Sequence, residues 1–190
     1  MRKSLMTFLC AALALGATVA RAAEVKISGK TLTIKDNANP LKKKATFLSK
    51  DPTFTVGSLD PTTQFTFVQF SNPVTFEAST GWSMPPSLWT AKNGKFTYKD
   101  KTLTGCGDPP PCAVSSALMK NGQIKISAKS GGMNYGLFNW PPQQQLRVNL
   151  YVGGTSVCTL FPGALGKLKK DDPVKGVFSA TNAEAPAACN

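Results

Sequence analysis

The chain has 190 residues, a formal net charge of +12 and no histidine. The lack of histidine excludes Ser-His-Asp and Cys-His catalysis, histidine-bound zinc or haem, and blue copper centres. Arg147 is the only arginine after residue 22, and most lysines are scattered along the sequence. Proteins that read nucleic acids rely on clustered arginine, so we expect no nucleic-acid partner and interpret the lysines mainly as a soluble surface.

The first 22 residues have the pattern of a cleaved secretory signal peptide. Two basic residues precede an apolar run from Leu5 to Ala20, which ends in the small-x-small triplet Ala20-Arg21-Ala22. The run is shorter than the ~20 residues of a membrane span, and no second long apolar run follows. We therefore predict a signal peptide at 1–22, a single domain at 23–190, a secreted or periplasmic location, and no membrane span after cleavage.

Short alternating runs between turn signals follow in chain order, as expected for strands. Val25 to Ile27 and Leu32 to Ile34 alternate on either side of Gly29-Lys30, which predicts a first hairpin. The run from Phe65 to Phe70 alternates over six positions, and the turn signal after it leads into a further predicted strand at 74–76.

The second half of the chain carries the strongest hairpin signals. Asn93-Gly94 and Asn121-Gly122 each precede an alternating run. The segment 113–120 is predicted to be a loop or a short strand, since Val114-Ser115-Ser116 is poor helical material. More alternating runs begin at Leu146, Val157 and Val177. Strands thus recur at roughly ten-residue intervals. We predict an all-β fold, an antiparallel β-sandwich of the Greek-key, Ig-like or jelly-roll type, with a β-barrel as the alternative.

Four cysteines remain after residue 22, namely Cys106, Cys112, Cys158 and Cys189. An even count in an exported chain indicates disulfides. Among three possible pairings we favour Cys106–Cys112, which brackets a short proline-rich loop, and Cys158–Cys189, which ties a C-terminal tail to a strand. The spacing fits no zinc pattern, so we predict no metal and no cofactor.

All three tryptophans lie in two proline-flanked segments, 81–89 and 134–142. A tryptophan on a stiff loop can make a stacking platform for a sugar ring or a peptide. The candidate ligand-binding residues are Trp82, Trp89, Tyr135, Trp140 and Gln144. The alternative, which the high average burial of tryptophan favours, is that each loop covers an open end of the sandwich.

Carboxylates give little support for catalysis. Nearly all ten acidic residues lie beside turn-forming residues or lysine. Glu77 is the exception, because it follows the predicted strand at 74–76, but alternation equally places it on the solvent face and it has no identifiable partner. We predict no catalytic residue and a protein that is not an enzyme.

Several short motifs occur together in a fixed order. They are Leu32-Thr33-Ile34-Lys35-Asp36-Asn37, Ser49-Lys50-Asp51-Pro52, Val157-Cys158-Thr159-Leu160-Phe161 and Ala185-Pro186-Ala187-Ala188-Cys189. In this order they resemble an uncharacterised exported bacterial module, found alone or as one part of larger chains. The resemblance implies a bacterial, exported, β-rich protein and favours the Cys158–Cys189 bridge, and it brings no catalytic residue.

These observations predict a non-catalytic exported module that binds or scaffolds in the bacterial envelope or the extracellular space, with a polysaccharide or an envelope component as partner. One alternative is a carboxylate-dependent polysaccharide hydrolase. The other is adhesion to anionic surfaces through Lys42-Lys43-Lys44 and through Lys167, Lys169 and Lys170.

Overall fold

Strands make up most of the computed structural model, which describes residues 23–79, 81–104, 113–129, 132–133, 135–137 and 141–189. The described residues form thirteen strands and two short 3-10 helices, η1 (Pro40–Lys42) and η2 (Pro86–Leu88). The strands are β1 (Ala23–Lys26), β2 (Gly29–Lys35), β3 (Lys44–Ser49), β4 (Thr66–Ser71), β5 (Trp82–Met84), β6 (Trp89–Lys92), β7 (Lys95–Lys99), β8 (Val114–Lys120), β9 (Gln123–Lys129), β10 (Leu146–Val152), β11 (Thr155–Phe161), β12 (Lys167–Asp172) and β13 (Val177–Ala183). None of the described helices is long and apolar enough to span a membrane.

The predicted signal peptide, Cys106, Cys112 and Trp140 lie outside the described residues.

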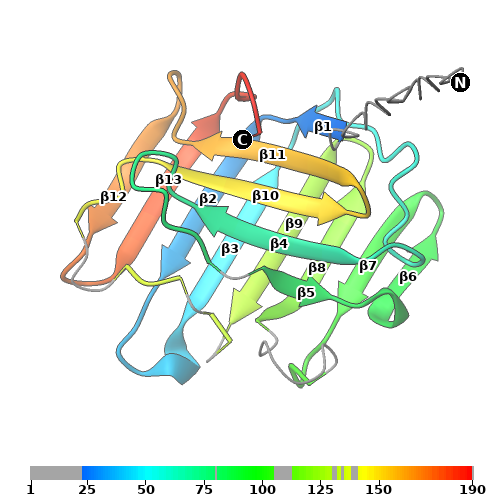
Figure 1. Cartoon of the computed structure of the whole chain (residues 1–190), viewed down its shortest axis with the longest axis horizontal. Helices are drawn as coiled ribbons and strands as arrows, with labels where there is room; N and C mark the ends of the chain where they lie inside the picture. The colour runs from blue at the N-terminus through cyan, green and yellow to red at the C-terminus, as the bar shows by residue number, and fades with distance from the viewer. Residues whose placement is uncertain are drawn as a thin grey trace, which may run out of the picture.

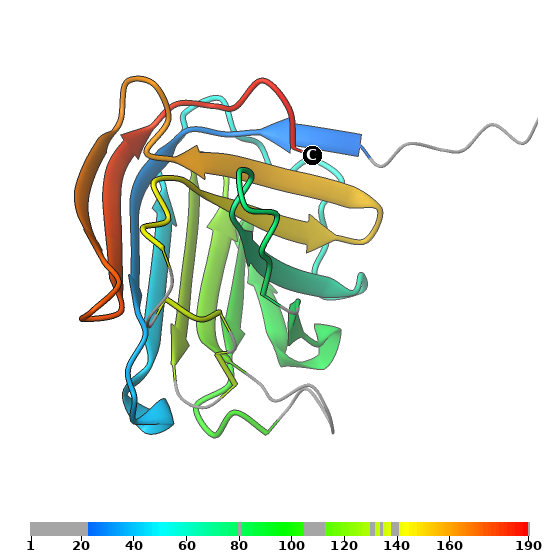
Figure 2. The same ribbon diagram turned by 60° about the vertical axis from the view of Figure 1, so that its left-hand side comes forward.

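The strands form two sheets that pack face to face, so the predicted all-β, sandwich-like fold is confirmed at this level. The smaller sheet has the order β1-β11-β10-β4-β5, and the larger has the order β12-β13-β2-β3-β9-β8-β7-β6. Every pair of neighbouring strands is antiparallel except β1 and β11, which are parallel. The strands of the two sheets cross at a steep angle (Figure 1), and the turned view shows the larger sheet bending behind the smaller one (Figure 2).

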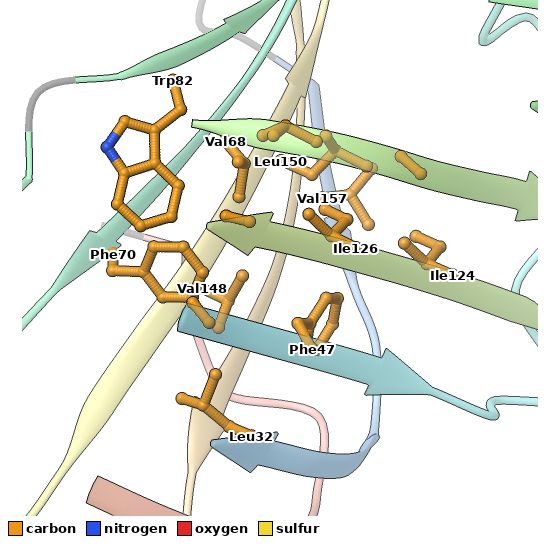
Figure 3. Packing of buried hydrophobic residues seen from close by; sticks show 14 of the residues in the cluster. Leu32, Phe47, Val68, Phe70, Trp82, Ile124, Ile126, Val148, Leu150 and Val157 are labelled. Atoms are coloured by element: carbon orange, nitrogen blue, oxygen red, sulfur yellow. The ribbon is translucent and has the colours of Figure 1, made fainter. Parts of the chain in front are cut away.

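The core lies between the sheets because alternation directs every second side chain inward. On the larger sheet Leu32, Phe47 and Ile126 are buried, and they face Val148 and Leu150 of the smaller sheet (Figure 3). Full burial of one such side chain contributes roughly 1.5–3 kcal/mol. The outer face of the larger sheet is thereby left open to solvent, whereas Asn149, Ser156 and Cys158 on the outer face of the smaller sheet are buried.

The predicted first hairpin is wrong. Residues 23–26 pair with β11 in the smaller sheet, whereas β2 pairs with β3 and β13 in the larger one. The chain passes between the sheets just before Gly29, where a Cβ atom would lie 2.2 Å from the ring of Phe161. A glycine is therefore required here by the close approach of an aromatic ring rather than by a turn.

The segments 74–76 and 113–120 also differ from the strands that the sequence predicts. The predicted strand at 74–76 is a turn, held by a hydrogen bond from the amide of Phe76 to the carbonyl of Asn72 at 2.9 Å. The segment 113–120 contains a full strand, β8. By contrast, both Asn-Gly pairs lie at the predicted hairpin turns, between β6 and β7 and between β8 and β9.

The predicted Cys158–Cys189 disulfide is present, with Cα atoms 5.5 Å apart. Cys158 lies in β11, and Cys189 lies near the end of the C-terminal tail. The tail is also held by a hydrogen bond from Lys26 Nζ to the carbonyl of Ala187. The bridge therefore fixes the tail over the outer side of β1 and β11.

Candidate functional site

The residues that the sequence singled out for stacking are mostly buried in the structure. Trp82 packs against Phe70 with ring centroids 4.9 Å apart. The indole nitrogen of Trp89 is also buried and donates to the carbonyl of Met84 at 3.2 Å. Tyr135 is buried as well and donates to Gln143 Oε1 at 2.7 Å. These three rings belong to the core and offer no stacking surface to a ligand.

Gln144 is exposed, and the interactions that define its position involve its backbone. Its φ is +56°, and its amide donates to Asp171 Oδ2 at 2.7 Å. Among the five candidate residues, the structure therefore brings no two together as an open aromatic surface within the described part of the chain.

Glu77 lies in the turn after β4 rather than in a strand. Burial raises the pKa of the Tyr135 phenol, and the negative charges of Glu77 and Asp171 raise it further. Asp171 accepts the hydrogen bond from the Gln144 amide described above, so its role is to hold the loop that contains Gln144.

Exposed lysines gather on the outer face of the larger sheet. Six adjacent strands, β2, β3, β9, β8, β7 and β6, contain nine lysines and no acidic residue. We use "lysine face" for the outward side of β6 to β9, which carries Lys92, Lys95, Lys99, Lys120, Lys125 and Lys129, all of them exposed. The four strands lie side by side in Figure 1. The lysines that look scattered in the sequence are thus concentrated by the strand order.

Several lysines lie directly opposite one another across neighbouring strands. Lys95 of β7 is in register with both Lys92 of β6 and Lys120 of β8. At the other end of the sheet, Lys44 is in register with Lys35 and Lys129. Like charges at such positions destabilise a sheet. No carboxylate within these six strands compensates them, so this arrangement opposes folding.

Three shallow hollows lie on this face, and Lys95 lines all of them. One, of about 350 Å³, follows β6 and β7 past Thr90 and Thr97. A second, of about 290 Å³, crosses from β7 to β9 past Ser116 and Lys125. The third, of about 400 Å³, lies at the β6–β7 turn. Ammonium and hydroxyl groups therefore share the first two hollows, which Leu88 and Leu118 also line.

The chemistry of the face is that of a broad anion-binding surface. Its outward residues include hydroxyls from threonine and serine but neither arginine nor an aromatic ring. Lysine offers a compact point charge without the planar fork that arginine uses for specific phosphate recognition. Stacking on bases needs aromatic rings, which are lacking on these strands. The surface therefore suits carboxylate or sulfate groups among hydroxyls.

The lysine patches considered from the sequence alone are weaker. Lys43 is paired with Asp36 at 2.8 Å, and Lys170 lies 3.7 Å from Asp172. Each of the two patches therefore has one lysine whose charge is partly compensated. The lysine face has no such pair among the described residues.

Comparison with protein-family models, with curated proteins and with solved structures finds no match to this chain. The resemblance to an exported bacterial module therefore stays an expectation.

Proposed function

We propose that this protein is an exported, non-catalytic module that binds an anionic polysaccharide on its lysine face. The observation that carries the proposal is the register of Lys95 with Lys92 and Lys120, without an acidic residue in the surrounding strands. Local rules for stable sheets are broken in this way mainly where a function requires it. A bound polyanion would remove the repulsion that the free protein carries.

The spacing of the lysines favours a polymer over a single small anion. Neighbouring strands lie ~4.8 Å apart, and alternate residues along one strand lie ~6.8 Å apart. These separations are shorter than the Debye length of ~8 Å at physiological salt. The potentials of neighbouring ammonium groups therefore add, and a chain with repeated charges gains from many of them at once.

A polysaccharide fits this face better than the other common polyanions. Thr90, Thr97 and Ser116 line the same hollows as the lysines and can exchange hydrogen bonds with sugar hydroxyls. Export is supported by the signal-peptide pattern at 1–22 and by the Cys158–Cys189 disulfide, since disulfides persist in oxidising compartments.

The test is a titration of the mature protein with polygalacturonate, with uncharged dextran as the matched neutral polymer, at 20 mM and 300 mM salt. We expect binding to polygalacturonate alone, and weaker binding at high salt because the contacts are screened. The variant K92T/K95T/K120T should lose most of the affinity. Binding of dextran with equal strength, or binding that salt does not change, would contradict the proposal.

The control variant is K42T/K169T/K175T, which removes the same net charge from exposed positions outside the lysine face. It should retain most of the affinity. If it loses binding while K92T/K95T/K120T retains it, the anionic ligand attaches through the 42–44 and 167–170 patches instead. Vesicles with anionic lipid, offered in place of polygalacturonate, distinguish a membrane surface from a polysaccharide, and preferential binding to the vesicles would overturn the choice of ligand.

A further inference from the structure

The outer face of the smaller sheet carries polar atoms that lack partners. Arg147 Nε and Asn149 Oδ1 are both buried without a hydrogen bond, and the Asn149 residue is only 4% exposed. Both residues point outward from β10, because Leu146, Val148 and Leu150 fill the core. Asn149 is in register with Cys158, beside the bridge that holds the C-terminal tail. Buried polar groups are nearly always paired in folded proteins, so the unpaired Arg147 Nε is the atom that indicates a missing partner.

Arg147 has no acidic partner among the residues that the structure describes. None of the carboxylates in the described part of the chain forms an ion pair with it. It lines a hollow of about 200 Å³ together with Ser71, Asn72, Pro73 and Phe76. The charge of the guanidinium is therefore available at the wall of an open hollow, where its planar fork suits a carboxylate.

Phe76 stands beside this hollow in an unusual conformation. Its side chain is 89% exposed and its φ is +60°. A bulky residue seldom adopts this left-handed backbone, and such strain persists only where the surrounding structure imposes it. An apolar ring that is exposed to solvent on a strained backbone contributes little to folding. We therefore explain the Phe76 ring as a contact surface.

A buried network holds the turn that presents Phe76. Asn72 Oδ1 accepts hydrogen bonds from the amides of Val74 at 2.8 Å and Thr75 at 3.2 Å. Asn72 Nδ2 donates to Gln143 Oε1 at 3.1 Å, and the Tyr135 hydroxyl donates to the same oxygen at 2.7 Å. The hollow is therefore preorganised by groups beneath it, which reduces the entropy lost on binding.

Aromatic rings continue the surface along the same strands. Phe67 of β4 and Tyr151 of β10 are in register and stacked, with centroids 4.4 Å apart. Phe65 lies 5.8 Å from Phe67 and is 57% exposed. Gly81 leaves room for the Phe67 ring, since a Cβ there would lie 2.6 Å from it. Apolar rings thus occupy outward positions where a solvent-facing strand normally carries polar residues.

We infer that the outer face of the smaller sheet is a second binding site, for a short oligosaccharide that carries a carboxylate. Its rings stack on Phe67 and Tyr151 at one end and on Phe76 at the other, and its carboxylate pairs with Arg147. Arg147 and Tyr151 are four residues apart on β10, a span of ~13 Å. Gln69, half-buried between the ends, donates its Nε2 to the carbonyl of Ser79 at 3.0 Å, which leaves its side-chain oxygen to accept from a sugar hydroxyl.

This site is separate from the lysine face, because the two lie on the outer sides of different sheets. The inference does not rest on the proposed function. A chain can bind a long polyanion through lysines and still lack the oligosaccharide site, and the reverse also holds.

The experiment is an NMR titration of the ¹⁵N-labelled mature protein with trigalacturonate, and with its fully methyl-esterified form as the neutral matched ligand. We expect trigalacturonate to shift the amide signals of 71–77 and 147–151 and the ester to bind about tenfold more weakly, because it loses the charged pair with Arg147. Shifts confined to β6–β9 would overturn this site while supporting the lysine face. Equal affinity for acid and ester would overturn the role of Arg147.

Two variants complete the test. R147Q should weaken trigalacturonate binding about tenfold and leave the binding of the ester unchanged. F76A changes a side chain that is almost fully exposed, so the fold is preserved, and it should weaken both ligands. K92T/K95T/K120T should bind trigalacturonate like the wild type. Wild-type affinity of both R147Q and F76A, or no shift anywhere, would overturn the inference.

Discussion

Lys95 lies directly opposite Lys120 in the antiparallel pair of β7 and β8, and opposite Lys92 in the pair of β6 and β7. A sheet selected for stability alone would place an acidic residue at the centre of this row. In this row of three lysines, stability and polyanion binding therefore have opposite requirements. One substitution should improve folding and impair binding of a polyanion.

Replacing the central lysine tests this separation. Lys95→Glu removes two like-charge contacts and creates two opposite-charge contacts, so the free energy of unfolding should rise by roughly 0.5 kcal/mol at low salt. Affinity for polygalacturonate should fall at the same time. Urea unfolding at 20 mM and 300 mM salt measures the first effect, which should shrink at high salt. A variant that is less stable than the wild type at low salt would refute the repulsion argument.

The disulfide should contribute strongly to stability. The Cys158–Cys189 bridge closes a loop with a sequence separation of 31 residues. In the chain-entropy model a loop of this length stabilises the folded state by ~3–4 kcal/mol. The double variant C158A/C189A should therefore lower the free energy of unfolding by about 3 kcal/mol in a urea titration. An equal loss when the wild type is reduced would show that the bridge, rather than the packing of Cys158, is responsible.

Asp51 should make the protein sensitive to acid. Burial of its carboxyl tends to raise the pKa, but hydrogen bonds from Ser28 and Thr53 outweigh it and hold the pKa of Asp51 below its ordinary value. The Ser28 amide donates at 2.7 Å, and the Thr53 hydroxyl also donates at 2.7 Å. A carboxyl with a lowered folded-state pKa stabilises the fold above the unfolded-state pKa, ~3.9 for aspartate, and this contribution is lost as the pH falls through the folded value.

The corresponding measurement is the free energy of unfolding between pH 6 and pH 2.5. It should decline below about pH 4 in the wild type. Asp51→Asn should be less stable at pH 6 and should show a shallower decline. Parallel curves for the two proteins would mean that other carboxyls account for the acid sensitivity.

The hydrolase alternative leads to a clear expectation as well. Glu77 is the one carboxylate that the sequence suggests for catalysis, and it lies outside any strand, after β4. For a non-catalytic module, the chain length of polygalacturonate should stay constant during prolonged incubation, and Glu77→Gln should bind it as the wild type does. New reducing ends that appear with the wild type and not with Glu77→Gln would establish the hydrolase instead.

The features predicted correctly from the sequence are those that depend on neighbouring residues. Asn93-Gly94 specifies a tight hairpin whatever surrounds it, and the alternation of residues 146–152 defines β10 by itself. The strand β12 was not expected, because Lys167–Asp172 has no hydrophobic alternation and forms an edge strand. The parallel pair of β1 and β11 joins segments more than a hundred residues apart, and no local pattern reports such a pairing.

The candidate sites depend on that long-range order and were therefore hidden. Lys95 and Lys120 meet only because β7 pairs with β8, although the spacing of Lys95 and Lys99 already placed both on one face of a strand. The prediction that Phe65 to Phe70 alternates over six positions is wrong, because apolar residues occupy both sets of alternate positions. The sequence alone therefore does not show that Phe67 points outward. The position of the tryptophans in proline-flanked segments suggests a stacking surface, but Trp82 and Trp89 are part of the core.

The crossing at Gly29 offers a test of how tightly the two sheets are packed. A Cβ at this position would lie 2.2 Å from the Phe161 ring, so Gly29→Ala should lower the free energy of unfolding by about 1–3 kcal/mol through overpacking. Gly154→Ala is the matched control, since no atom lies within 4 Å of its added Cβ, and it should be nearly neutral. Phe161→Leu replaces the ring by a smaller side chain. In the double variant it should therefore reduce the loss in the free energy of unfolding that Gly29→Ala causes. Additive losses in a urea-unfolding double-mutant cycle would show that the two residues do not share this space.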